Sequence, residues 1–173
     1  LDGKFCQRVP QGTEGATERV NKMGKVVYEK YFDSFVGKLV GIKTKDSEWG
    51  KQWLFSFQDK GEVYILQMPY SNGLAVAFLK MVPNVDLSKE MKVTPSTKEI
   101  EGKKRSSIFI NQDGVAIKHA YTKDNPNGLP EWESVIIKGQ PVGDNTKQLA
   151  FLQAMVEKDI LPKLGQVAPV VAD

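Results

Sequence analysis

The chain has 173 residues, enough for one domain with a well-filled core, and its 40% hydrophobic and 26% charged residues exclude a largely disordered protein. Its net charge of +3 is only mildly basic, so a nucleic-acid site would need basic residues that cluster locally. Cys6 is the one cysteine of the sequence, which excludes an internal disulfide framework and a cysteine-rich zinc site.

The sequence also indicates where the protein works. No apolar run approaches the roughly 18 residues that a membrane-spanning helix needs, and the first residues do not resemble a secretion signal. A single cysteine fits a reducing compartment. We therefore expect a soluble, cytoplasmic protein with no membrane partner.

The N-terminal part of the chain predicts an arm followed by a first strand. Residues 1–24 contain several glycines and polar side chains without a stable period, and we expect an extended arm there. Residues 26–42 are rich in aromatic and β-branched residues and predict a strand. Gly37 and Gly41 within it indicate a bend or a bulge, as in a small barrel whose first strand serves both halves of the sheet.

Two strands at 51–58 and 62–68 follow, and the connection Asp59-Lys60-Gly61 predicts a hairpin between them. Trp53 lies in the first of these strands, with Phe55 and Phe57 on the same face.

This aromatic row has two interpretations, because it can fill the interior of a barrel or form a platform on which bases stack. If the row is interior, Trp49 in the charged loop before the hairpin is the better stacking candidate. Tyr64 in the second strand is a less certain one.

The middle of the chain predicts a helix and a fourth strand. Apolar residues at helical spacing indicate a helix over 73–82, which Pro83 ends. A strand is expected at 90–94 and a polar loop at 95–106. That loop carries three consecutive basic residues: Lys103, Lys104 and Arg105. A run of this kind is either a solvated loop or one wall of a binding groove.

The rest of the chain predicts a second hairpin and a C-terminal helix. Strands at 107–111 and 115–121 flank Gln112-Asp113-Gly114, and Phe109 points to the side opposite its apolar neighbours. After a short strand at 133–139, a helix with one apolar stripe begins at Asp144 or Asn145. The stripe either closes one end of the barrel or forms a homodimer contact.

A helix between the third and fourth strands is the element order of the OB-fold, a five-stranded, partly open barrel. We therefore expect a mainly β fold with helices. Over residues 35–121 the chain also resembles the OB-fold single-stranded-DNA-binding proteins encoded by bacteriophages and bacterial mobile elements. The resemblance rests on the strand order, on the aromatic and basic hairpin, and on the segment Phe78-Leu79…Pro83-Asn84-Val85-Asp86. The predicted parts of the chain are an arm at 1–24, a barrel at 25–121, a loop, strand and helix at 122–164, and a tail at 165–173.

The resemblance implies sequence-independent binding of single-stranded DNA in replication or recombination, by base stacking and phosphate contacts and without a cofactor. By position it makes Trp49 and Trp53 the stacking candidates, and it assigns phosphate contacts to Lys43, Lys45, Lys51, Lys103, Lys104 and Arg105. Phe109 and Tyr64 are further candidates for ring contacts. Replication proteins would be additional partners. Many proteins of this class end in an acidic tail, whereas only Asp173 is acidic after Gly165, so either recruitment by a tail is in doubt or such a tail lies beyond this sequence.

Other functions remain open at the level of the sequence. A single-stranded RNA binder would use the same residues, and an OB barrel can also serve as a protein-interaction or assembly module. An enzyme is not expected, because His119 has no partner pattern for a metal or a nucleophile and the chain contains no phosphate-binding glycine motif.

Overall fold

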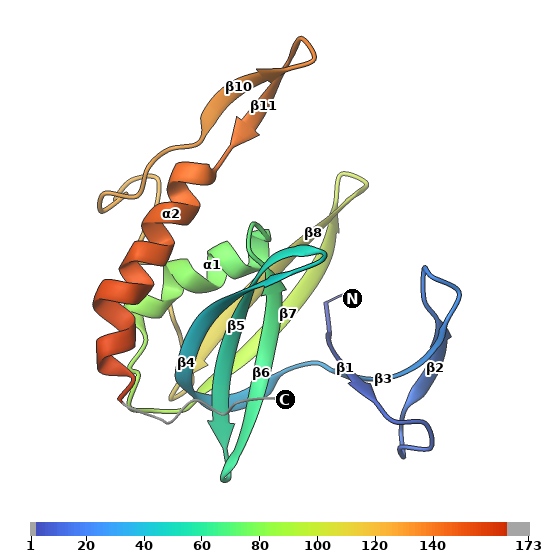
Figure 1. The fold of residues 1–173 in the computed structure, drawn as a ribbon. Helices are drawn as coiled ribbons and strands as arrows, with labels where there is room; N and C mark the ends of the chain where they lie inside the picture. Colours follow the sequence, from blue (N-terminus) through green and yellow to red (C-terminus); the bar gives the residue numbers. More distant parts are fainter. Residues whose placement is uncertain (1–2, 166–173) are drawn as a thin grey trace. The chain divides into compact units, whose positions relative to one another are not determined.

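The computed structural model describes residues 3–165 and is mainly β, with two α-helices in that part of the chain (Figure 1). The mainly β fold class is confirmed. The chain divides into two compact units. One contains the residues up to Phe35 together with Val93–Phe109, and the other contains Val36–Lys92 together with the residues from Ile110 onward. Of the predicted tail at 165–173, only Gly165 lies within the described residues.

The first unit contains a three-stranded antiparallel sheet in the order β1-β3-β2. Its strands are β1 (Phe5–Val9), β2 (Thr17–Val20) and β3 (Val26–Phe32). The sequence did not predict β1 and β2, which fall within the expected arm. The strand expected at 26–42 is in fact two strands, since the chain leaves the sheet at Asp33 and Ser34 before β4 (Phe35–Ser47) begins.

A buried carboxylate explains why such polar strands hold together. Glu29 on β3 is almost completely buried and accepts two hydrogen bonds from the Arg19 guanidinium, at 2.9 and 2.7 Å. It also accepts one from the Tyr31 hydroxyl at 2.7 Å, and Arg8 lies 3.7 Å away. A buried charge needs such partners. Hydrogen bonds from Arg19 and then Tyr31 lower the pKa of Glu29 to about 2.

A six-stranded sheet has the order β6-β5-β4-β7-β8-β9. The strand β4 is continuous but irregular: its register against β5 (Gly50–Asp59) shifts between Leu39 and Gly41, so the predicted bulge is confirmed. Its place between β5 and β7 agrees with a first strand that serves both halves of a sheet. The hairpin of β5 and β6 (Glu62–Pro69) is also confirmed, and Lys60 and Gly61 turn the chain with φ of 48° and 82°.

The aromatic row of β5 belongs to the core. Trp53, Phe55 and Phe57 are each at most 1% exposed. Phe55 and Phe57 pack edge-on against Phe78 of α1 (Gly73–Met81), at 4.8 and 6.1 Å between ring centroids. The predicted helix is present, and the Asn72 side chain caps it by accepting a hydrogen bond from the Leu74 amide. The platform interpretation of the row is therefore wrong.

The predicted loop at 95–106 is wrong. The chain instead continues as β7 (Met91–Ile100), turns at Glu101 and Gly102, and returns as β8 (Lys103–Gln112). Both turn residues have positive φ, 53° and 72°, which is the geometry of a two-residue hairpin turn. The segment is polar because the residues of both strands next to the turn are exposed and need few apolar side chains. A polar segment of this kind was therefore predicted as a loop.

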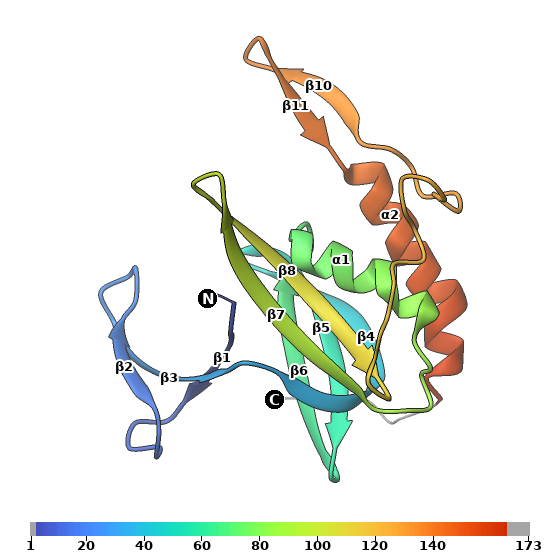
Figure 2. The same cartoon turned by 180° about the vertical axis from the view of Figure 1, so that it is seen from behind.

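The last part of the chain contains a second small sheet and the C-terminal helix. The strand β9 (Val115–Ala116) pairs with β8, and β10 (Glu133–Ile137) forms a hairpin with β11 (Gln140–Asp144), a strand that the sequence did not predict. The predicted helix is present as α2 (Thr146–Met155), which continues into a π-helical segment at Val156–Ile160 and a short 3-10 turn at Leu161–Lys163. Figures 1 and 2 show the β10–β11 hairpin projecting from the start of α2.

The end strands β6 and β9 of the large sheet do not pair with each other, so the described residues form no closed barrel. The five-stranded OB barrel expected from the sequence is therefore not confirmed and remains a prediction. None of the helices between residues 3 and 165 has the length and apolar character that a membrane span requires.

Candidate nucleic-acid interface

One face of the β7–β8 hairpin brings basic side chains and an aromatic ring together within the first unit. Because side chains alternate along a strand, Lys103, Arg105 and Phe109 share the side opposite to the buried Ile108 and Ile110. On β7, Lys98 and Ile100 lie opposite to the buried Val93 and Pro95 by the same rule. We call this set the basic hairpin face: Lys98, Ile100, Lys103, Arg105 and Phe109.

The register of the hairpin decides which of these residues face each other. The two-residue turn and the 3.0 Å hydrogen bond between the hydroxyls of Thr97 and Ser106 set the pairing of the two strands. Counting one step from that pair toward the turn places Lys98 directly across from Arg105. Like charges opposite each other destabilise a strand pair, so this arrangement is suited to binding an anion.

Phe109 supplies a ring on the same face. It is 48% exposed, whereas the two residues beside it in the strand are almost completely buried. A phenyl ring held on the outside of a sheet, on the same face as cationic side chains, can stack on a base. The basic hairpin face therefore combines the two kinds of contact that single-stranded nucleic acid requires.

The basic hairpin face carries no acidic side chain of its own strands. Glu99 alternates to the other side with Thr97, and Glu101 lies in the turn. Lys104 also lies on that other side, so only two of the three consecutive basic residues point the same way. Among the residues that the structure describes, no carboxylate forms an ion pair with Lys98, Lys103 or Arg105.

A second candidate position, in the other unit, is the corner between β4 and β5. Trp49 is 75% exposed at the turn, where the Ser47 hydroxyl accepts a hydrogen bond from the Trp49 amide and donates one to the Gly50 carbonyl. Lys43 and Lys45 are exposed on β4, on the sheet face opposite to Trp53. We call Lys43, Lys45 and Trp49 the β4–β5 corner.

Trp53 is not available for stacking on a base. Its indole lies in the core, stacked on Tyr70 at 5.1 Å between centroids, and its Nε1 donates a hydrogen bond to the Tyr70 carbonyl at 3.2 Å. The sequence places Trp49 and Trp53 four residues apart. In the structure Trp49 is exposed to solvent at the turn and Trp53 is buried in the core.

Lys51 is likewise engaged inside the second unit. Its Nζ donates a hydrogen bond to Gln153 Oε1 at 2.9 Å and lies 4.3 Å from the centre of the Tyr70 ring. The Tyr70 hydroxyl donates to the same Gln153 oxygen at 2.7 Å. Lys51 thus links the sheet to α2, and we no longer assign it a phosphate contact.

Tyr64 is exposed but lies far from the β4–β5 corner. It pairs with Phe57 near the β5–β6 turn, and its hydroxyl donates to Glu62 Oε2 at 2.6 Å, which raises the pKa of Tyr64. Seven residues of β5 separate its level from that of Gly50, about 23 Å at the rise of a strand. Trp49 and Tyr64 therefore do not belong to one stacking site.

Two exposed residues of interest were missed by the sequence. Lys98 lies in the predicted loop, and the side to which a loop side chain points cannot be predicted from alternation. The Glu-Gly pair after Ile100 nevertheless indicates a hairpin turn. Trp132 was passed over entirely, and it is 59% exposed beside β10, with its Nε1 donating to Gln148 Oε1 at 3.2 Å.

His119 has a pKa lowered by partial burial and by the nearby Lys80 ammonium. No group of three or more His, Cys, Asp or Glu residues that could hold a metal ion occurs in the described part of the chain. Comparison with protein-family models, with curated proteins and with solved structures finds no match to this chain.

Proposed function

We propose that the protein binds single-stranded DNA without sequence preference, as a non-enzymatic factor in replication or recombination. The observation that carries this proposal is the basic hairpin face, where Lys98 and Arg105 oppose each other on the same side of the hairpin as the exposed ring of Phe109. Two cations held close together attract a phosphodiester, and the ring supplies a stacking partner for a base of the same nucleic-acid strand.

Contacts of these two kinds give binding without a sequence code. Phosphate contacts carry no sequence information, and every base has a face on which a ring can stack. Each stacked base contributes about 1–3 kcal/mol, so one phenyl ring with three cations on the same face forms a modest site. The β4–β5 corner, with Lys43, Lys45 and Trp49, is a second and separate position that we propose for single-stranded DNA, in the other unit.

The proposed architecture is an OB-fold built from β4, β5, β6, β7 and β8. Three observations support it: α1 follows the third of these strands, β4 lies between β5 and β7, and a bulge bends β4 near Gly41. In this chain the connection after the first of these strands is the β4–β5 turn with Trp49, and the connection after the fourth is the β7–β8 turn beside Lys103.

The direct test is fluorescence anisotropy of a labelled oligo-dT with the purified protein, in parallel with a duplex and an RNA oligomer of equal length. The proposal predicts salt-dependent binding to the DNA single strand and weaker binding to the duplex, because paired bases offer no face to Phe109. A preference for the RNA oligomer would indicate that the site binds single-stranded RNA instead of DNA. Absence of binding to all three at low salt would refute the proposed function.

A further inference from the structure

The hairpin of β10 and β11 exposes apolar side chains that its own unit leaves uncovered. Ile136, Ile137 and Val142 are exposed, and Ile136 reaches 69%. An isolated two-stranded hairpin is only marginally stable in water, so an exposed apolar surface of this kind marks a contact site. Figures 1 and 2 show the hairpin extending beyond the N-terminal end of α2.

The tip of the hairpin carries one apolar and one cationic side chain. Ile137 pairs with Gln140, and the turn between them consists of Lys138 and Gly139, with φ of 52° and 77°. The end of the projection therefore presents one branched apolar side chain and one ammonium group. We call Ile137 and Lys138 the hairpin tip.

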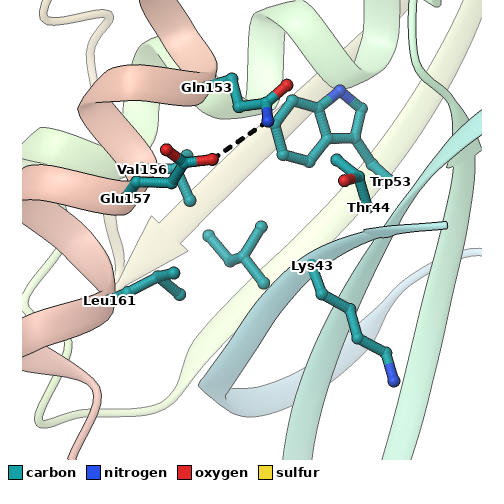
Figure 3. Close-up of a pocket in the computed structure, with 8 residues that line it drawn as sticks. Lys43, Thr44, Trp53, Gln153, Val156, Glu157 and Leu161 are labelled. Atoms are coloured by element: carbon teal, nitrogen blue, oxygen red, sulfur yellow. Dashed lines mark hydrogen bonds between the residues drawn. The ribbon is translucent and has the colours of Figure 1, made fainter.

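A hollow with complementary chemistry lies at the other end of α2. It has a volume of about 270 Å³ and is lined by Ile42, Trp53, Val156 and Leu161 on its apolar side. Thr44, Gln153 and Glu157 provide its polar groups, and Gln153 Nε2 donates a hydrogen bond to Glu157 Oε1 at 3.0 Å. In Figure 3 the ammonium of Lys43 points away from the hollow, so Glu157 sets the charge at its rim.

The π-helical segment helps to build this hollow. A π-helical turn is rare and is often found at functional sites. Here it covers Val156–Ile160 and places Val156 and Glu157 on the hollow, just before Leu161.

We infer that the hairpin tip of one molecule inserts into this hollow of a second copy of the chain, with Ile137 against the apolar side and Lys138 beside Glu157. Apolar surface meets apolar surface, and an ammonium meets a carboxylate. A molecule cannot fill its own hollow, because the hairpin leaves α2 at its start and the hollow lies at its other end, seven or more residues and about 10 Å along the axis.

Such a contact is heterologous, since it joins two different surfaces. Heterologous contacts that do not close into a ring produce open chains of molecules. A single tip in a small hollow buries less than the roughly 1,200–2,000 Å² of a stable complex. The association is therefore weak and depends on concentration, and it does not require DNA binding.

Sedimentation analysis of the full chain without DNA tests the inference. The wild-type protein should show a mass that rises with concentration. Two variants should remain monomeric: Ile137→Ser with Lys138→Ala, which removes the tip, and Glu157→Lys, which reverses the charge of the hollow. All three positions carry exposed side chains, and circular dichroism checks that the variants fold. Lys123→Glu is the control for a changed surface charge, and it should associate like the wild type.

Mixing the two variants gives the decisive result. The intact tip of the Glu157→Lys molecule fits the intact hollow of the other variant, so the mixture should form a one-to-one complex and nothing larger. The double charge exchange Lys138→Glu with Glu157→Lys should restore association at least tenfold over either single change. A mixture that stays monomeric, or a wild type that is monomeric at every concentration, would overturn the inference.

Discussion

Lys98 of β7 and Arg105 of β8 lie directly across their strand pair from each other, one step from the hydrogen-bonded pair of Thr97 and Ser106. Strands normally place opposite charges or neutral groups in such positions. Within the described residues no carboxylate pairs with either side chain. A phosphate between them would relieve this repulsion, so the proposed binding of single-stranded DNA would also stabilise the hairpin.

Arg105→Ala should therefore have opposite effects on stability and on binding. Removing one of two opposed cations should increase the free energy of unfolding at low salt by about 0.2–1 kcal/mol, while the affinity for oligo-dT decreases. Urea denaturation and anisotropy measure the two quantities. Loss of stability together with loss of affinity would instead indicate that Arg105 has a structural role.

Phe109→Ala should weaken binding by about 1–3 kcal/mol, the contribution of one stacked base, with little change in stability because the ring is half exposed. Ile110→Ala is the matched control in the same strand. It should destabilise the protein by about 2–5 kcal/mol, since Ile110 is buried. Titration of oligo-dT together with chemical denaturation checks both results. If Phe109→Ala binds oligo-dT with unchanged affinity, the ring of Phe109 does not contact the DNA.

Tryptophan fluorescence distinguishes the β4–β5 corner from the rest of the second unit. Trp49 and Trp132 are exposed and Trp53 is buried, so a bound base can quench only the first two directly. We expect oligo-dT to quench the wild type and Trp132→Phe alike, whereas Trp49→Phe should lose most of the quenching. Full quenching in Trp49→Phe would place the strand elsewhere.

The three-stranded sheet of the first unit should lose stability in acid. The pKa of Glu29 is about 2 in the folded protein, below its ordinary value of 4.5, because Arg19 and Tyr31 donate hydrogen bonds to the ionised carboxylate. The stabilisation is complete above pH 4.5 and is lost as the pH falls toward 2. Hydrogen exchange of β1 and β3 amides follows this loss, and Glu29→Gln should remove the pH dependence. The same dependence in that variant would assign it to another group.

The sequence predicted the elements whose signals are local. The β5–β6 hairpin carries strand alternation and a Lys-Gly turn in one short stretch, and α1 carries helical spacing between Asn72 and Pro83. The bulge of β4 was indicated by Gly41. The exposure of Trp49 also has a local signal. If the aromatic row containing Trp53 is interior, Trp49 in the charged loop before the hairpin is the tryptophan expected to face solvent.

The elements that were missed depend on distant partners. The strands β1 and β2 are short and polar, and they are ordered by Glu29 of β3 through Arg8 and Arg19, which no local pattern reveals. The outer half of the β7–β8 hairpin has few apolar residues, so its alternation is visible only after the turn at Glu101 and Gly102 is recognised. The contact of Lys51 with Gln153 could not be predicted, because the two residues are 102 positions apart in the sequence.

The salt dependence of oligo-dT binding is the most direct measurement of the proposed basic hairpin face. The double variant Lys98→Ala with Arg105→Ala should reduce the log–log slope by about 1.4, two contacts at roughly 0.7 each for a single strand. Lys104→Ala, which alters the opposite side of the same hairpin, should leave the slope nearly unchanged. Equal slopes for the wild type and the double variant would contradict the proposal that these two cations hold the phosphate backbone.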